Sequence, residues 1–440
     1  MVTGKGVAEG FLASHEVEAT AREGLRAMAV DDRRVLVLIP DGTRTMPMPT
    51  MFDLLECEIG PRAAALDYLV ALGTHAPMTD AQLSAHIGRP VVNGFIVGAN
   101  LTVGADLTVG ADLKVGPYRS RIFNHRWDDP SAFATLGTIP ASEIAAITNG
   151  KLSQDVPIEL NRLVTEYDQL LICGPVFPHE VAGFSGGAKY LFPGIAAPGI
   201  IHFTHWLGAL ITSYEIIGTI DTPVRAVIDR AAAFLDVPVS LVALVTTHDG
   251  VAGVFCGDVQ GAWREAARLS SRRHIVWVDS PFERVVSVMP SMYADMWTAA
   301  KGMYKMEPAM VDGGEVIIYA PHVNEVSHVH GSLLDEIGYH CRDYFVEQWA
   351  RFAHYPGGIL AHSTHLKGAG TFDAASAVET PRVEVTLATG IPSERCERIN
   401  LGFLDHRTIS PDEWPTEVGH DTLLVPRAGE VLYRVGRPPD

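Results

Sequence analysis

The sequence predicts an α/β fold, with two α/β domains, mainly parallel sheets and an active-site cleft between them. Three observations lead to this prediction. Continuous apolar runs alternate with polar exit loops and helical segments, which is typical of βαβ units. The alternation is interrupted at residues 271–281 and then starts again. The length of 440 residues, of which 47% are hydrophobic, suits two hydrophobic cores better than one.

Residues 1–272 are expected to form an N-terminal domain that carries the cofactor and the acid/base chemistry. Its strands are continuous apolar runs, as is usual when both faces of a parallel sheet are buried. They lie at residues 34–40, 64–72, 170–174 and 239–247. Helices are expected at residues 17–28, 51–55 and 254–270, and a strand and helix within residues 147–168. Thr79 is a suitable N-cap for one more helix.

Residues 273–440 are expected to form a C-terminal domain that closes the substrate cleft. Two strands, at residues 285–289 and 315–320, flank a helix at residues 294–304. The tail, residues 422–435, has short strand character, and the sequence permits packing on either domain.

Residues 100–117 contain a six-residue repeat with apolar residues two apart. Three turns are too few for a β-solenoid domain. We expect a β excursion or a contact between copies of the chain, and we assign it no chemistry.

The composition excludes several classes of protein. A formal net charge of −18 argues against nucleic acid or an anionic membrane surface as the main partner. The five cysteines are scattered without a C-x-x-C pair, which argues against a disulfide framework and fits a reducing compartment. Residues 1–6 lack the apolar core of a signal peptide. A cytoplasmic protein is therefore expected.

Polar clusters follow four of the expected elements. The carboxyl ends of parallel strands meet at one edge of a sheet, so clusters from several strands are expected to share one cleft. The first three are Asp41/Thr43/Arg44, Thr74/His75 and residues 179–189; Trp297/Thr298/Lys301, from the second domain, is expected to close the cleft.

The turn at residues 185–189, Ser-Gly-Gly-Ala-Lys, has two interpretations. Consecutive glycines let backbone N–H groups approach a phosphate. Ala188 and Tyr190 on either side of Lys189 do not fit a Walker A loop, so an NTPase is disfavoured. As a structural turn the glycines need no ligand.

Histidines supply the other candidates. His202 and His205 share a helix face and permit a shared metal. His75 and His179 follow different strands, and two imidazoles can act as acid and base from opposite sides of a substrate. His322, His328 and His330 permit a metal site but are interpreted mainly as structural or substrate-facing.

These motifs together resemble the nickel-pincer-nucleotide lactate racemase family. The resemblance rests on Asp41-Gly-Thr-Arg44, Gly73-Thr-His75, the run from Pro178 to Lys189, and His205, and it covers roughly residues 35–301. The most specific part is the spacing of His179, Lys189 and His205.

The resemblance implies a 2-hydroxy acid racemase or epimerase with a nickel ion held in a pyridinium-3,5-bisthiocarboxylic acid mononucleotide. His205 is then the protein ligand to nickel, and Lys189 lies at the thioacid end of the cofactor. The nucleotide would be held by Asp41, Thr43 and Arg44. His75 and His179 would be the acid/base pair, moving the hydroxyl proton while hydride leaves and returns through a 2-keto acid. The substrate would be bound by Arg44, Trp297, Thr298 and Lys301.

Two features depart from the family pattern. Trp297-Thr298 stands where the pattern has Tyr-Gln, which alters the substrate wall and argues against lactate itself. The indole favours a side chain less polar than that of a sugar acid. The repeat at residues 100–117 is an insertion.

Two alternatives stay open. One is a zinc hydrolase using His202, His205 and a third ligand such as His179; the other is an inactive homologue that keeps the nucleotide pocket. The expected partners are a small 2-hydroxy acid and separate cofactor-maturation enzymes, with no nucleic acid or membrane. Whether the chain forms a homo-oligomer is left open.

Overall fold

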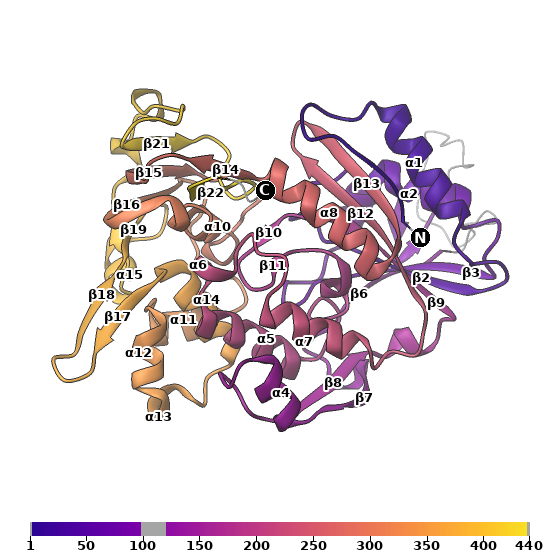
Figure 1. The fold of residues 1–440 in the computed structure, drawn as a ribbon, viewed down its shortest axis with the longest axis horizontal. Helices are drawn as coiled ribbons and strands as arrows, with labels where there is room; N and C mark the ends of the chain where they lie inside the picture. Colours follow the sequence, from indigo (N-terminus) through magenta and orange to yellow (C-terminus); the bar gives the residue numbers. More distant parts are fainter. Residues whose placement is uncertain (1, 98–119, 438–440) are drawn as a thin grey trace.

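The computed structural model describes residues 2–97 and 120–437 of the chain. Figure 1 shows two sheets side by side along the long axis, with the short strands β10 and β11 between them. The repeat at residues 100–117 lies outside the described residues.

The first sheet has seven strands in the order β1-β13-β12-β9-β2-β3-β6. Their bounds are β1 Thr3–Gly6, β2 Arg34–Ile39, β3 Ala65–Val70, β6 Ile122–Asn124, β9 Gln169–Pro175, β12 Val239–Thr247 and β13 Gly250–Asp258. From β12 to β6 all neighbours are parallel, whereas β13 and β1 are added antiparallel at the other edge. The predicted mainly parallel sheet is confirmed.

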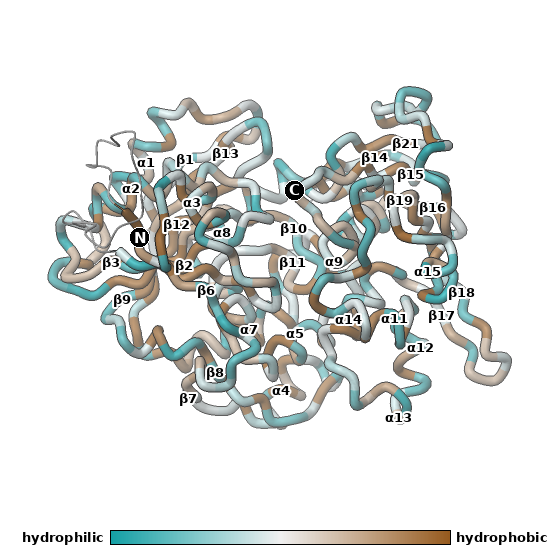
Figure 2. The backbone as a smooth tube through the Cα atoms, turned by 180° about the vertical axis from the view of Figure 1, so that it is seen from behind, coloured by the Kyte–Doolittle hydropathy of each residue, from teal (hydrophilic) through white to brown (hydrophobic). Residues whose placement is uncertain are grey.

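Both faces of this sheet are buried, which explains the continuous apolar runs. Along β2, Leu36 and Leu38 enter one core while Val35, Val37 and Ile39 enter the other. One face is covered by α1 Ser14–Arg26, α2 Met48–Glu58 and α3 Asp80–Ile87, and the other by α5 Pro198–Ile211, α7 Pro223–Ala232 and α8 Val259–Arg273. Figure 2 shows the central strands as brown, apolar segments inside more polar loops.

The second sheet has five parallel strands in the order β20-β19-β16-β15-β21. They are β15 Phe282–Val288, β16 Met310–Ala320, β19 Val383–Thr389, β20 Gly402–Phe403 and β21 Thr422–Val425. The helices of this half are α9 Met296–Ala299, α10 Lys301–Tyr304, α11 Gly331–Ile337, α12 Arg342–Glu347, α13 Trp349–Phe352, α14 Gly357–Lys367 and α15 Ser393–Arg398.

Short elements complete the chain. Two-stranded pairs are formed by β4 Val91–Val92 with β5 Phe95–Ile96, β7 Phe133–Ile139 with β8 Val156–Asn161, β10 Pro178–His179 with β11 Gly183–Phe184, β14 Ile275–Val278 with β22 Leu432–Val435, and β17 Gly370–Asp373 with β18 Val378–Pro381. The remaining α-helices are α4 Ala141–Ile147 and α6 Ser213–Ile216.

Three sequence predictions were wrong in detail. Residues 254–258 belong to β13, because they pair with β12 before α8 begins at Val259. The helix expected at residues 294–304 is divided into α9 and α10. Within residues 147–168 the structure has strand β8 and a 3-10 turn, Arg162–Thr165, instead of a strand and an α-helix.

The tail contacts both halves of the chain. β22 pairs with β14, and Arg434 Nη1 donates to the Ile217 carbonyl at 2.7 Å. The Thr45 hydroxyl donates to Glu430 at 2.9 Å. The two sheets come from opposite sides of residue 272, but the boundary itself stays a prediction.

Candidate active site

A cavity of about 140 Å³ opens where the strands of the first sheet end and meets α9, α10 and α14 of the second half. Nine of the ten predicted site residues line it: Asp41, Arg44, His75, His179, Lys189, His205, Trp297, Thr298 and Lys301. Thr43 lines a smaller neighbouring pocket instead. The structure therefore brings the four polar clusters together, as the strand-exit argument requires.

The loop after β2 orients His75 through Asp41. One Asp41 oxygen accepts the Thr43 N–H at 3.0 Å and the Thr43 hydroxyl at 2.6 Å, and the other lies 2.5 Å from His75 Nδ1. Burial opposes ionisation of Asp41, but His75, Arg44 and Thr43 together hold its pKa well below its usual value. The ionised carboxylate accepts a hydrogen bond from the Nδ1–H of His75. In the neutral ring, Nε2 then has no proton and offers a lone pair.

The hydrogen bonds of His179 favour the opposite tautomer from that of His75. It lies in the β10–β11 hairpin, and its Nδ1 accepts the Val181 N–H at 3.1 Å, which places the proton of the neutral ring on Nε2. The Glu180 carboxylate lies 3.2 Å from the same Nδ1. Burial, followed by the charges of Lys189 and Arg44, lowers the pKa of His179 well below its usual value.

His205 presents a free ring nitrogen to the cavity. Its Nδ1 donates to the Ile201 carbonyl one turn earlier in α5, at 2.7 Å, so its Nε2 carries the lone pair. Burial and the nearby Lys189 lower the pKa of His205 to about 4, and the ring is neutral at pH 7. A histidine with one N–H bound to a carbonyl and the other nitrogen free is the usual form of a metal ligand.

Lys189 ends the glycine turn in a cationic environment. Burial, Arg44 and Arg225 lower its pKa to about 7, so the neutral amine is accessible near pH 7. Neutral amines are nucleophiles, whereas ammonium groups are not.

The glycine turn itself is explained by packing. Gly186 has φ 78°, and a Cβ there would lie 2.6 Å from Val176 Cγ2. Arg225 donates to the carbonyls of Phe184 and Gly186. The turn continues into a 3-10 turn, Gly187–Tyr190, and not into an α-helix whose N-terminus could bind a phosphate. These features favour the structural interpretation over a phosphate loop.

Gly186→Ala should therefore destabilise the protein by about 2 kcal/mol, because it adds backbone strain and a clash. Chemical unfolding would measure this loss. Gly199→Ala is the matched control: Gly199 lies in α5, a Cβ there would have no neighbouring atom within 4 Å, and alanine favours helix by up to about 1 kcal/mol. Equal stability of the two variants would contradict the packing argument.

Residues 183–187 also spell G-x-S-x-G, the pattern of a hydrolase nucleophile elbow. The Ser185 hydroxyl donates to the Pro175 carbonyl at 3.1 Å and accepts the Phe177 N–H at 3.0 Å. Both bonds hold the loop, so this serine has a structural role.

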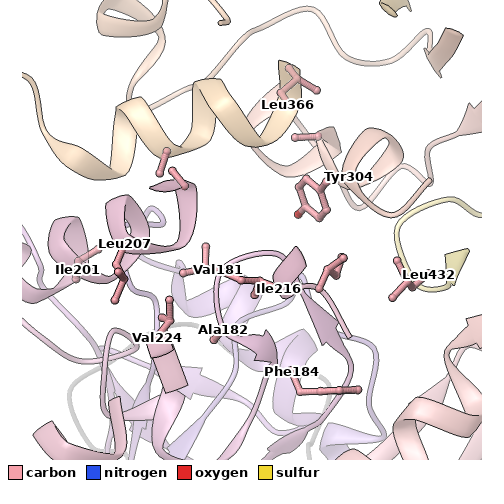
Figure 3. Packing of buried hydrophobic residues seen from close by; sticks show 14 of the residues in the cluster. Val181, Ala182, Phe184, Ile201, Leu207, Ile216, Val224, Tyr304, Leu366 and Leu432 are labelled. Carbon is pink, nitrogen blue, oxygen red and sulfur yellow. The ribbon is translucent and has the colours of Figure 1, made fainter. Parts of the chain in front are cut away.

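The loop that carries His179, Glu180 and Ser185 is anchored in the largest hydrophobic core. Figure 3 shows Val181, Ala182 and Phe184 among buried side chains that include Val224 and, from the second half, Tyr304. The site is thus built on rigid packing from both halves of the chain.

The second half contributes a cation and an aromatic wall. Lys301 Nζ donates to the Thr298 carbonyl at 3.1 Å, and burial together with Arg44 lowers its pKa to about 8. The Thr298 hydroxyl donates to Asp295, which caps α9. The centroid of the Trp297 ring lies 4.1 Å from the centroid of the His362 ring and 4.6 Å from that of the His330 ring.

Sequence reasoning gave no role to several residues that line the cavity: Glu180, Tyr304, Lys305, His362 and His365. Three of them carried a usable signal. His362 and His365 are three apart, as were the chosen His202 and His205, and Lys305 follows Lys301 by one helical turn.

The other predicted histidine groups do not converge. His202 is not among the residues lining the cavity, and its Nδ1 accepts the Gly358 N–H at 3.4 Å. His322 bonds to the Tyr293 carbonyl, whereas His330 packs on Trp297. Among residues 2–97 and 120–437, no group of three or more His, Cys, Asp or Glu side chains is arranged to hold a metal. The zinc-hydrolase alternative therefore gains no support.

Two further observations concern the whole chain. The five cysteines are all within the described residues and are free thiols. Within those same residues, no helix has the length and apolar character needed to cross a membrane.

Comparison with known proteins agrees with the motifs. The lactate racemase N-terminal domain family matches residues 16–216. A lactate racemase from Thermoanaerobacterium thermosaccharolyticum is 25% identical over 304 residues, and one from Lactiplantibacillus plantarum is 23% identical over 314. Each match covers 67% of this chain and 62% of the relative, so it spans less than two thirds of either enzyme.

Solved structures match over nearly the whole chain. A Thermotoga maritima protein is 30% identical, with a TM-score of 0.82, over 95% of this chain and 98% of that one. The lactate racemase apoprotein from Thermoanaerobacterium thermosaccharolyticum shares the fold at 19% identity, with a TM-score of 0.69 over 95% and 92% of the two chains. With the motifs, the domain match and these relatives in agreement, the chain belongs to the lactate racemase family.

Proposed function

We propose that this protein is an isomerase that inverts C2 of a 2-hydroxy acid, with a nickel-pincer nucleotide as its cofactor. The observation that carries the proposal is the pair of imidazoles, His75 and His179, which reach one cavity from two strand exits and each have a carboxylate at Nδ1. Inversion needs a proton-transfer group on each face of a planar intermediate, and two such histidines meet that need.

The residues present fit this cofactor. His205 would hold the nickel through its free Nε2, and the amine of Lys189 would lie at the thioacid end. Arg44 and Lys305 would offset the phosphate, while Asp41 and Thr43 shape the loop beside it. When bound, the cofactor supplies a hydride acceptor and donor for Cα.

His75 and Asp41 form the better-defined half of the acid/base pair. Neutral His75 offers an Nε2 lone pair to the substrate hydroxyl, and the 2.5 Å contact with Asp41 stabilises the imidazolium formed when it takes the proton. Arg44 and Lys301 would hold the substrate carboxylate and so fix the position of Cα.

His179 needs a change of partner before it acts as a base. While Nδ1 accepts the Val181 N–H, the proton is on Nε2 and no lone pair faces the cavity. Moving that proton to Nδ1, where Glu180 lies 3.2 Å away, exposes the Nε2 lone pair. We assign Glu180 the role toward His179 that Asp41 has toward His75: its carboxylate would accept the Nδ1–H and so orient the ring.

The test uses cofactor-loaded protein and single enantiomers of several 2-hydroxy acids deuterated at C2. Chiral chromatography should show inversion, and mass spectrometry should show that deuterium stays on C2 in ordinary water. Loss of deuterium to solvent would contradict hydride transfer and indicate proton abstraction at C2. No inversion of any substrate would favour the inactive homologue.

A further inference from the structure

The turn that precedes β22 connects the two halves of the chain beside the proposed site. The Glu430 carboxylate, 15% exposed, accepts the Thr45 hydroxyl of the first half at 2.9 Å and lies 3.2 Å from His248 Nδ1. The backbone carbonyl of the same residue accepts Lys305 Nζ, from the second half, at 2.8 Å. The side chain of Glu430 is thus bound to one half and its main chain to the other, and the proposed reaction assigns this residue no role.

Close packing fixes the tail segment, residues 428–430, on the second half. The Ala428 N–H donates to the carbonyl of the last residue of β15 at 2.9 Å. Gly429 has φ 103°, and a Cβ there would lie 2.9 Å from Tyr293 Cε2 and 3.2 Å from Lys301 Cβ. A glycine lets the chain take this conformation and approach these side chains closely. The segment therefore keeps a fixed position relative to Lys301.

The partner of Glu430 belongs to the loop that carries Arg44. The small pocket beside the cavity is lined by Thr45 and Glu430, and also by Arg44 and Lys301. The two cations, which would hold the substrate carboxylate, come from different halves of the chain. The bond between Thr45 and Glu430 joins these halves within the same pocket, so it restrains the separation of the two cations.

We infer that Glu430 is a positioning residue: its bond to Thr45 fixes the separation of the two cations that hold the substrate carboxylate. Cations from two elements bind one carboxylate well only when their separation matches it. The acid/base histidines, in contrast, contact carboxylates of their own half. Loss of the link should therefore weaken substrate binding more than proton transfer. This inference rests on the proposed function, which supplies the carboxylate.

Two substitutions remove the bond and leave the groups of the cavity in place. Glu430→Ala deletes the acceptor, and Thr45→Val replaces the donor with a methyl group of similar size. With cofactor-loaded protein, each should raise KM for the inverted 2-hydroxy acid by about 10-fold and change kcat by less than about 3-fold, because the ground state and the transition state lose the same binding. A purely structural loss would reduce the fraction of folded enzyme, and so lower kcat with KM unchanged.

Conservative variants supply the controls. Glu430→Gln keeps an acceptor for the hydroxyl, and Thr45→Ser keeps the donor, so both should retain a KM close to that of the parent protein. Glu417→Ala changes an exposed carboxylate of the same tail and should have no effect. A KM raised as much in Glu430→Gln as in Glu430→Ala would overturn the role of the bond to Thr45. If Glu430→Ala does not fold, Thr45→Val decides the question.

Hydrogen exchange gives a second readout that needs neither cofactor nor turnover. In unloaded protein, the backbone amides of residues 41–46 should exchange faster in Glu430→Ala and Thr45→Val, whereas those of β16 should exchange as in the parent protein. If the parent inverts C2, unchanged exchange or an unchanged KM in both variants would overturn the inference and leave the proposed function intact. Absence of inversion by the parent would overturn the proposed function, and with it the role of Glu430 in substrate binding.

Discussion

Asp41→Asn is expected to lower kcat for inversion by up to about 10⁴-fold, the size of effect that the same change has in a serine-protease triad. The asparagine amide has the same shape as the carboxylate but donates as well as accepts. It would donate to His75 Nδ1 and move the ring proton to Nε2, where no lone pair would remain for the substrate hydroxyl. It would also remove the negative charge that stabilises the imidazolium.

Initial rates with saturating substrate measure this effect. Asp53→Asn is the control, because that carboxylate pairs with Arg89 at the surface and is 46% exposed. The control should keep its activity, since exposed ion pairs contribute only about 0–1 kcal/mol to stability. If Asp41→Asn retained the kcat of the parent protein, the assignment of His75 as a base oriented by Asp41 would be wrong.

His205→Ala is expected to lower the nickel retained per chain by at least about 10-fold, the lower end of the effect seen even for changes outside the ligand shell. The reason is that His205 is the histidine of α5 with a free Nε2 at the cavity. Nickel analysis of cofactor-loaded protein after dialysis gives the result without any activity measurement.

His202→Ala provides the comparison for this change. His202 lies one turn earlier on the same helix, but its Nδ1 receives the Gly358 N–H. Loss of the His202 side chain should lower the free energy of unfolding by about 1 kcal/mol and leave the nickel content unchanged. Equal nickel content in the two variants would show that the ligand has been assigned to the wrong residue.

The strand exits of the first half could be predicted from sequence because their signal is local. A run such as residues 34–39 must be buried on both faces to be stable, and parallel strands must end at a common edge. That reasoning located Asp41, His75 and His179, and the spacing of His179, Lys189 and His205 carried the family resemblance. The boundary between β13 and α8 was missed. An apolar run that leads into a helix has no residue that shows where strand pairing ends.

What the sequence by itself determined is the set of polar side chains at those exits and the family to which they point. Only the tertiary structure decided the protonation of the histidines, because the partners of Nδ1 are Asp41 in one case and Val181 and Glu180 in the other. It also decided the far wall, where α14 brings His365 to the same cavity as Glu180 although the two are far apart in the sequence. Periodicity reports which face of an element is buried, whereas contacts between distant elements depend on how whole sheets and helices pack.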